Sequence, residues 1–172
     1  MNPVQLGRFT AQTDRPFVLL LIGMRINHFL TFSKWLPIIW AMRSMMRMLF
    51  RHPEKGFLGG HTLFHRRGVT VIQYWRSFED VEKFARSPSE PYLDVWKKFN
   101  QAIGSDGNVG IWHETYLIEP NRCESVYRNM PVYGLALATK HVPATGCRET
   151  ARRRLGGDNE PAIPLLPTPF AN

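Results

Sequence analysis

The sequence predicts one α+β domain, in which strands and helices follow one another in the order β-α-β-β-α-β. Two observations predict this class. Between residues 17 and 118 the apolar residues change from strand-like runs to a 3.6-residue period and back, and glycine, proline or asparagine lies at most of these changes. Of the 172 residues, 44% are hydrophobic, so the chain has enough apolar material to bury a core.

The first predicted strand runs from Phe17 to Asn27 and is apolar almost throughout, which is typical of a central strand covered on both faces. A helix is predicted from Lys34 to His52, because apolar residues recur there at three- and four-residue spacings. Its apolar stripe consists of Trp35, Ile38, Ile39, Met42, Met46 and Leu49. A second stripe, formed by Arg43, Arg47 and Arg51, lies on a different side and is interpreted as solvated.

Two β-prone runs follow, from Phe57 to His65 and from Val69 to Arg76, and they predict a hairpin. Its turn is the tripeptide Arg66-Arg67-Gly68. Ser77 and Asp80 then form a variant of the capping box that starts helices, so the next helix should begin near residue 78.

The second half of the domain is predicted to contain one more helical piece and one more strand. Prolines at positions 88 and 91 interrupt the second helix, and a helical period resumes afterwards. Its members are Tyr92, Val95, Trp96, Phe99 and Ile103. The turn at residues 105–108 leads into the last predicted strand, from Val109 to Ile118, which is rich in β-branched and aromatic residues.

This element order is the split βαβ, or ferredoxin-like, arrangement: an antiparallel sheet with both helices on one face. The other face would expose tryptophan and aliphatic side chains, which soluble monomers rarely tolerate. We therefore expect a twofold homodimer in which two such sheets close on each other as a dimeric α/β barrel, with a cavity that takes a small molecule.

The expected organisation of the chain has four parts. Residues 1–16 form an N-terminal arm, residues 17–120 the ferredoxin-like barrel domain, and residues 121–155 a C-terminal extension that packs on the domain or on the dimer partner. Residues 156–172 are rich in proline and lack periodicity, so we expect a disordered tail.

Cysteine usage and apolar run length predict a cytoplasmic protein without a membrane partner. Cys123 and Cys147 are the only cysteines and are interpreted as free thiols in a reducing compartment. The longest apolar run, Phe17 to Met24, is far shorter than the roughly 20 residues that a membrane span needs. Its flanking residues also do not fit a secretory signal.

The formal net charge of +8 raises the question of a polyanion partner. Much of the excess lies near the C-terminus, in Arg148 and the run Arg152-Arg153-Arg154, and no DNA- or RNA-reading motif accompanies it. We expect no specific nucleic-acid partner. No metal site is predicted either, since His61 and His65 are roughly 13 Å apart on an extended strand.

Five residues are candidates for a functional site. Trp75 is either a core aromatic or a cavity wall, and Gln73 shares its strand face, where it either lines a pocket or bonds to loop backbone. His113 is the only histidine of the last predicted strand and either acts as a catalytic base or has a structural partner. Arg25 and Asn27 share a face at the end of the first strand, where Arg25 either clamps an anion or is a surface charge.

The chain also resembles the antibiotic-biosynthesis-monooxygenase family of dimeric α/β barrels. The resemblance is closer to a bacterial and fungal branch of that family that includes a monooxygenase of the fumagillin pathway. It extends from about Gly7 to Leu155 and is carried by GRFTAQTDRPFV from Gly7, LIGMRIN from Leu21, KWLP from Lys34, HPEKGFLG from His52, QYWRSFEDVEKFA from Gln73, FNQAIGSDGNVGIWHETY from Phe99 and HVPATG from His141.

This resemblance implies a monooxygenase-like oxidoreductase that needs no cofactor and takes a small, apolar, electron-rich, polyketide-like metabolite and O2 as substrates. It also implies that Trp75 shapes the cavity. Haem-degrading relatives hold iron through a histidine on the second helix, but here no histidine lies between Gln73 and Trp112, which disfavours haem. The alternative is a non-catalytic barrel protein that binds a small ligand, with haem as one version of it.

Overall fold

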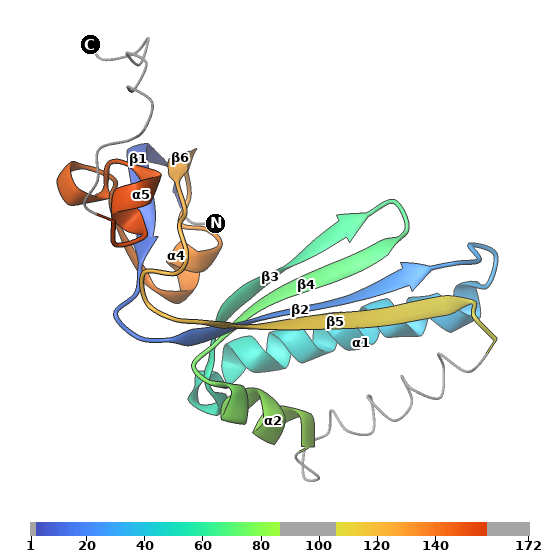
Figure 1. Cartoon of the computed structure of the whole chain (residues 1–172). Helices are drawn as coiled ribbons and strands as arrows, with labels where there is room; N and C mark the ends of the chain where they lie inside the picture. The colour runs from blue at the N-terminus through green and yellow to red at the C-terminus, as the bar shows by residue number, and fades with distance from the viewer. Residues whose placement is uncertain (1–2, 87–105, 158–172) are drawn as a thin grey trace.

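In the computed structural model, which describes residues 3–86 and 106–157, the chain forms two antiparallel sheets (Figure 1). The larger sheet has the strand order β3-β4-β2-β5 and is made of β2 (Phe17–Ile26), β3 (Phe57–His65), β4 (Gly68–Trp75) and β5 (Val109–Ile118). The smaller sheet has the order β6-β1-β7 and is made of β1 (Gln5–Gln12), β6 (Tyr127–Met130) and β7 (Lys140–Pro143).

The helices are placed as a ferredoxin-like unit requires. Helix α1 (Phe32–Arg51) lies along one face of the larger sheet, and α2 (Phe78–Arg86) follows β4 at one end of that sheet (Figure 1). The short helical elements are η1 (Pro53–Lys55), α4 (Leu135–Ala138), η2 (Gly146–Arg148) and α5 (Ala151–Arg154). The order β2-α1-β3-β4-α2-β5 confirms the predicted α+β fold with an antiparallel sheet. The helical piece predicted at Tyr92–Ile103 lies outside the described residues.

Strand β2 is the central strand that its continuous hydrophobicity predicts. It pairs with β4 on one side and with β5 along its whole length on the other. Val18, Met24 and Ile26 lie on the face under α1 and are buried. The strand therefore contributes one row of side chains to the core and another to the opposite face.

The core is the layer between α1 and the larger sheet. The helix buries Ile38, Met42, Met45, Met46 and Leu49, and the sheet meets them with Val69, Val71 and Trp75 from β4 and Val109 from β5. The apolar stripe predicted for this helix is confirmed, with Trp35 and Ile39 at its partly buried margin.

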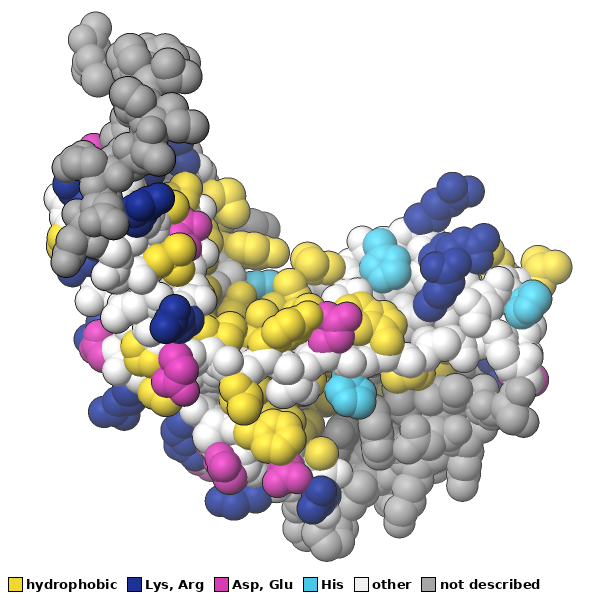
Figure 2. Space-filling model, in the orientation of Figure 1, with side chains coloured by type: hydrophobic (Ala, Val, Ile, Leu, Met, Phe, Trp, Pro, Cys, Tyr) yellow, Lys and Arg dark blue, Asp and Glu magenta, His cyan; other side chains and the backbone are white. Residues whose placement is uncertain are grey.

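The opposite face of the larger sheet is apolar and partly exposed. Figure 2 shows hydrophobic side chains gathered over the part of this sheet that lies next to the smaller sheet. Trp112 on β5 is paired with Gly23 and lies over it, since a Cβ added at Gly23 would be 2.5 Å from the indole ring. Trp112 and Tyr116 are both exposed and lie on the same side of β5.

The start of α2 confirms the predicted capping signal. The backbone N–H of Asp80 donates to the Ser77 hydroxyl at 3.2 Å, and the Arg76 guanidinium binds both carboxylate oxygens of Asp80, at 2.8 and 3.1 Å. Gly56 is packed directly against this carboxylate, where a Cβ would be 2.3 Å from an oxygen of Asp80. Gly56, which directly precedes β3, therefore holds the beginning of that strand against the start of α2.

The smaller sheet was not predicted. Its central strand β1 lies within the expected N-terminal arm, and β6 and β7 lie within the expected C-terminal extension. Side chains reinforce the pairing, because the Gly7 N–H donates to the Asn129 side chain at 3.0 Å and the Ala11 N–H donates to the Ser125 hydroxyl at 3.0 Å. Helix α4 contacts β3 on one side and β1 and β7 on the other, so it connects the two sheets.

Candidate functional site

Gln73 and Trp75 form a buried polar pair on the helix-covered face of β4. They are two residues apart and therefore point to the same side of the strand. The indole N–H of Trp75 donates to the side-chain oxygen of Gln73 at 2.9 Å, and both side chains are buried. Phe57 and Phe84 contact the Trp75 ring, with centroids 5.7 and 5.3 Å away. The pair is thus a hydrogen bond inside an apolar layer.

The amide nitrogen of Gln73 is poorly satisfied in this layer. It lies 3.7 Å from the Met46 sulfur on α1, and a thioether is a weak acceptor, whereas the amide carries two N–H donors. A buried donor without a strong acceptor is costly in an apolar core. The arrangement leaves a donor that could bind an oxygen atom of a ligand more favourably than it binds sulfur.

His113 lies on the same face of the sheet, away from this pair. It is exposed on β5 opposite Ile22, whereas Gln73 is aligned with Leu20. Two strand spacings and two residues separate His113 from Gln73, roughly 12 Å between Cα atoms. Leu20 and Ile22 are partly buried between them. The side chains between the two groups thus belong to the layer packed against the core.

Arg25 and Asn27 form a separate pair at the end of β2. The Arg25 Nε donates to the Asn27 side-chain oxygen at 3.2 Å, and the Asn27 amide donates to the Gly107 carbonyl at 2.9 Å. Both are exposed, and Arg25 points to the face of the sheet opposite α1, because its neighbours Met24 and Ile26 point into the core. Within one subunit the structure therefore does not bring Arg25 and Asn27 together with Trp75.

A ring cluster on the opposite sheet face had no counterpart among the predicted site residues. His61 on β3 is stacked on Tyr133, with centroids 4.3 Å apart and an interplanar angle of 8°, and meets the edge of Tyr74 at 6.3 Å. Burial lowers the pKa of His61 below its usual value, and burial, followed by the neighbouring Tyr127 and Tyr133, raises the pKa of Tyr74 to about 12. The strand period predicts the direction of His61, but Tyr133 comes from the segment before α4 and gives no local signal.

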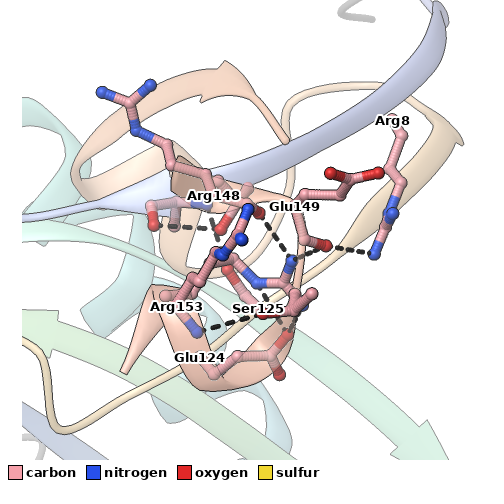
Figure 3. Close-up of polar contacts among 10 residues, drawn as sticks. Arg8, Glu124, Ser125, Arg148, Glu149 and Arg153 are labelled. Atoms are coloured by element: carbon pink, nitrogen blue, oxygen red, sulfur yellow. Dashed lines mark hydrogen bonds and ion pairs between the residues drawn. The ribbon is translucent and has the colours of Figure 1, made fainter. Parts of the chain in front are cut away.

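Part of the basic C-terminal segment is structural. Figure 3 shows arginines from β1, η2 and α5 gathered around Glu124 and Glu149, where the Arg8 guanidinium donates to the backbone carbonyl of Glu149 at 2.8 Å. The Arg154 side chain is buried, pairs with Glu124 and donates to the carbonyls of Arg148 and Glu149 at 2.8 and 2.9 Å. These bonds hold α5 against the segment that precedes β6.

Two cavities lie at or near the smaller sheet. One of about 520 Å³ lies where the two sheets meet, with Phe17, Arg76 and Lys140 among its lining residues. Another of about 230 Å³ is lined by residues that include Cys123 and Cys147. Trp75 lines neither of them. Within residues 3–86 and 106–157 no cluster of three metal-binding side chains occurs, and no helix there combines the length and hydropathy needed to cross a bilayer.

Comparisons with known proteins give one partial relative among curated sequences. The chain is 37% identical over 62 residues to Monooxygenase af470 of Aspergillus fumigatus, which is 36% of this chain and 21% of that protein. The chain thus aligns with about a fifth of this relative's length.

Solved structures resemble the chain at low identity. SnoaB, a cofactor-independent oxygenase from Streptomyces nogalater, is 11% identical, with 60% of this chain and 93% of that chain covered and a TM-score of 0.43. Hydroxynitrile lyase from Passiflora edulis is 16% identical, with 60% and 94% covered and a TM-score of 0.43. A conserved protein of unknown function from Bacteroides thetaiotaomicron is 11% identical, with 60% and 99% covered and a TM-score of 0.45.

One family model matches the whole ferredoxin-like unit and continues into the segment after it. The match covers residues 17–135, which include every strand of the larger sheet, the Gln73 and Trp75 pair, and His113. The chain belongs to the Monooxygenase af470-like family.

Proposed function

We propose that this protein is a monooxygenase that inserts oxygen into a small, apolar, electron-rich metabolite of polyketide type without a metal or flavin. Membership of a monooxygenase family supports the reaction class. The observation that carries the proposal for this chain is the buried Gln73 and Trp75 pair, whose amide nitrogen has the Met46 thioether as its acceptor among the described residues.

In the proposed reaction the substrate itself reduces dioxygen. A C–H or O–H proton leaves an enol- or phenol-like substrate, the resulting anion transfers electrons to O2, and a new C–O bond forms. For a CH2 group the balance is one O2 consumed, one oxygen atom retained as C=O and the other released as water with the two hydrogens. All four electrons come from the substrate, so no external reductant is required.

The chain's residues would supply position and electrostatics. The Gln73 amide donates to the anionic substrate oxygen, because a fixed donor in an apolar layer stabilises developing charge without reorganisation. The Trp75 ring fixes that amide through its hydrogen bond to the Gln73 oxygen. His113, exposed at the margin of the same face, accepts the substrate proton as a general base.

The proposal includes a homodimer and the four-part division of the chain predicted above. The exposed Trp112 and Tyr116 on the uncovered sheet face support pairing of two sheets. Arg25 and Asn27 lie towards that same face, so any contact of theirs with substrate would be made across the dimer. A cytoplasmic location likewise remains a proposal.

Oxygen uptake with labelled O2 tests the reaction. Metal-stripped protein is incubated with a panel of phenols, enols and reduced polycyclic ketones under ¹⁸O2 and under argon. A substrate should consume one O2 per turnover and gain one labelled oxygen atom, and labelled water should appear in equal amount. Oxygen uptake that requires added metal, flavin or reductant would contradict the proposal.

Variants separate catalysis from ligand binding. His113→Asn should lower kcat by about 100-fold or more while ligand affinity changes little, because a base acts in the transition state. His65→Asn is the matched control, since His65 is also exposed on the larger sheet, on β3. Compounds that bind without oxygen uptake, with unchanged affinity in both variants, would favour the alternative of a binding protein. A Soret shift on adding haem would identify its haem-binding version.

A further inference from the structure

The side of α1 that faces away from the sheet is aromatic and basic, which is unusual for a solvated helix. At about 100° per residue, Trp40 points almost directly away from the buried side chains of Ile38, Met42 and Leu49. Trp40 is 58% exposed, and on the same side Leu36 is 44% and Phe32 57% exposed. These three residues are successive i, i+4 neighbours and form one continuous apolar strip.

Arginines continue this strip towards the C-terminal end of the helix. Arg43, Arg47 and Arg51 fall within the same arc of about 100° as Leu36 and Trp40. We call the set Phe32, Leu36, Trp40, Arg43, Arg47 and Arg51 the outer stripe. The Arg43 guanidinium lies 6.0 Å from the Trp40 ring centre, so the apolar and basic halves are in contact.

No acidic residue occurs anywhere between Phe32 and Arg51. A solvated helix face usually alternates charges of both signs, whereas this face carries one sign only. Lys34 does have an acidic partner, Asp106 at 3.2 Å, but it lies off the outer stripe. The stripe therefore presents a purely positive charge beside exposed tryptophan and phenylalanine.

The loop before α1 carries further exposed apolar side chains. Leu30 is 87% exposed, and Phe29 is exposed with the Arg67 guanidinium 5.2 Å from its ring centre. The Trp35 indole N–H donates to the Phe29 carbonyl at 3.0 Å, which fixes this loop to the helix. The exposed aromatic surface is thus held on a rigid element and is again accompanied by arginine.

We propose that the outer stripe is a docking surface for anionic lipid headgroups, so that the protein is a peripheral membrane protein. A helix that lies in a membrane interface combines tryptophan, phenylalanine and leucine, which enter the boundary of the acyl chains, with arginines that contact anionic headgroups. The expectation of no membrane partner rests on the absence of a spanning segment, and surface docking requires none.

Charge complementarity favours lipid over a second copy of the chain. A twofold contact of this face would bring Arg43, Arg47 and Arg51 of both copies into one interface, with no acidic group on either α1 helix to balance them. The uncovered face of the larger sheet is the better surface for a second copy, because it is apolar and carries Glu114 beside its aromatic residues. The two surfaces lie on opposite sides of the core, so docking and dimerisation are compatible.

Vesicle co-sedimentation of the full chain tests this inference. The probes are vesicles of phosphatidylcholine alone and of phosphatidylcholine with phosphatidylserine at a ratio of about 2 to 1. The protein should sediment with the anionic vesicles and remain in solution with the neutral ones. Each arginine contributes about fivefold to partitioning, so the triple variant R43Q/R47Q/R51Q should bind about 100-fold more weakly.

The matched control removes the same charge elsewhere. R15Q/R122Q/R152Q replaces three exposed arginines outside α1 and should leave vesicle binding nearly unchanged. W40S tests the apolar contribution and should weaken binding at constant charge. Circular dichroism and thermal unfolding should show that all three variants keep the fold, since every replaced side chain is exposed.

Three results would overturn the inference. The first is absence of wild-type binding to anionic vesicles. The second is equal loss of binding in the two triple variants, which would show attraction by net charge alone. The third is a W40S variant that changes the oligomeric mass and leaves vesicle binding intact, which would assign the stripe to a second copy. None of these measurements depends on catalytic activity, so they are independent of the proposed function.

Discussion

At the scale of single residues, the Gln73 and Trp75 pair combines structural and proposed functional roles. The hydrogen bond between them satisfies the indole N–H in an apolar layer, where an unpaired donor would be costly. The same bond orients the Gln73 amide so that its nitrogen faces Met46 on α1. Stability and substrate binding at this position can therefore be separated by substituting one partner at a time.

Trp75→Phe should lower the free energy of unfolding by about 1–3 kcal/mol, because it leaves a small cavity and removes the hydrogen bond to Gln73. Urea unfolding monitored by circular dichroism measures the change. Trp40→Phe is the matched control, since Trp40 is 58% exposed on α1, and should change stability by less than about 0.5 kcal/mol. Equal losses in the two variants would contradict the burial argument.

His61 should make stability depend on pH. Because burial lowers its folded-state pKa, the unfolded chain binds a proton more readily, and the folded state loses stability as the pH falls below the unfolded value near 6.5. The wild type should therefore lose more stability between pH 7.5 and 5.5 than His61→Phe does. Urea unfolding at both pH values provides the comparison, and parallel losses would argue against a role of His61.

At the scale of elements, the predicted and observed structures agree where one segment contains its own signal. The central strand β2, the helix α1 and the β3 and β4 hairpin follow from local hydrophobic period and turn residues. The smaller sheet does not, because β6 and β7 are four residues long and become strands only by pairing with β1. Short strands with distant partners have too little local pattern to be recognised.

The ion pair between Arg76 and Asp80 stabilises the start of α2, so breaking it should destabilise the fold. Asp80→Asn weakens the two bonds from Arg76, and we expect a loss of about 1–2 kcal/mol because the Asp80 side chain is almost buried. Arg76 is itself exposed, which keeps the loss moderate. Glu82→Gln, in the more exposed pair with Arg86, is the control and should cost less than about 0.5 kcal/mol in the same urea titration.

The candidate site was predictable only in part. Strand period correctly places Gln73 and Trp75 on one face, but only the pairing of β2 with β4 shows that Arg25 points to the other face. What it cannot predict is that the Gln73 nitrogen meets a methionine sulfur, because this depends on how α1 crosses the sheet. The stacking of His61 on Tyr133 likewise depends on the path of a distant segment.

At the scale of the whole molecule, residues 3–86 and 106–157 leave part of an apolar sheet face exposed. Trp112 and Tyr116 are exposed there, and the Tyr116 hydroxyl donates to Glu114 at 2.7 Å. Closing two such faces would bury these rings and give the expected barrel. Trp112 and Tyr116 are also suitable for testing dimerisation, since they are exposed in one subunit and lie outside its core.

Trp112→Glu should convert a dimer into a monomer, because it would bury a carboxylate beside Glu114 in the closed interface. Light scattering at micromolar concentration measures the mass of the wild type and of the variant. Leu30→Glu, in the loop before α1, replaces a side chain that is 87% exposed, and as the control it should leave the mass unchanged. A monomeric wild type would contradict the proposed homodimer.

Because β1 pairs with β6 and β7, the smaller sheet can form only after the C-terminal part of the chain has been synthesised. Gly7 and its partner Asn129 are 122 positions apart, so a ribosome adding about 5–20 residues per second exposes β1 for several seconds before any strand can pair with it. The ferredoxin-like unit is encoded between these strands and emerges whole in that interval. Strands β6 and β7 then pair with β1 beside a unit whose strands have all been synthesised.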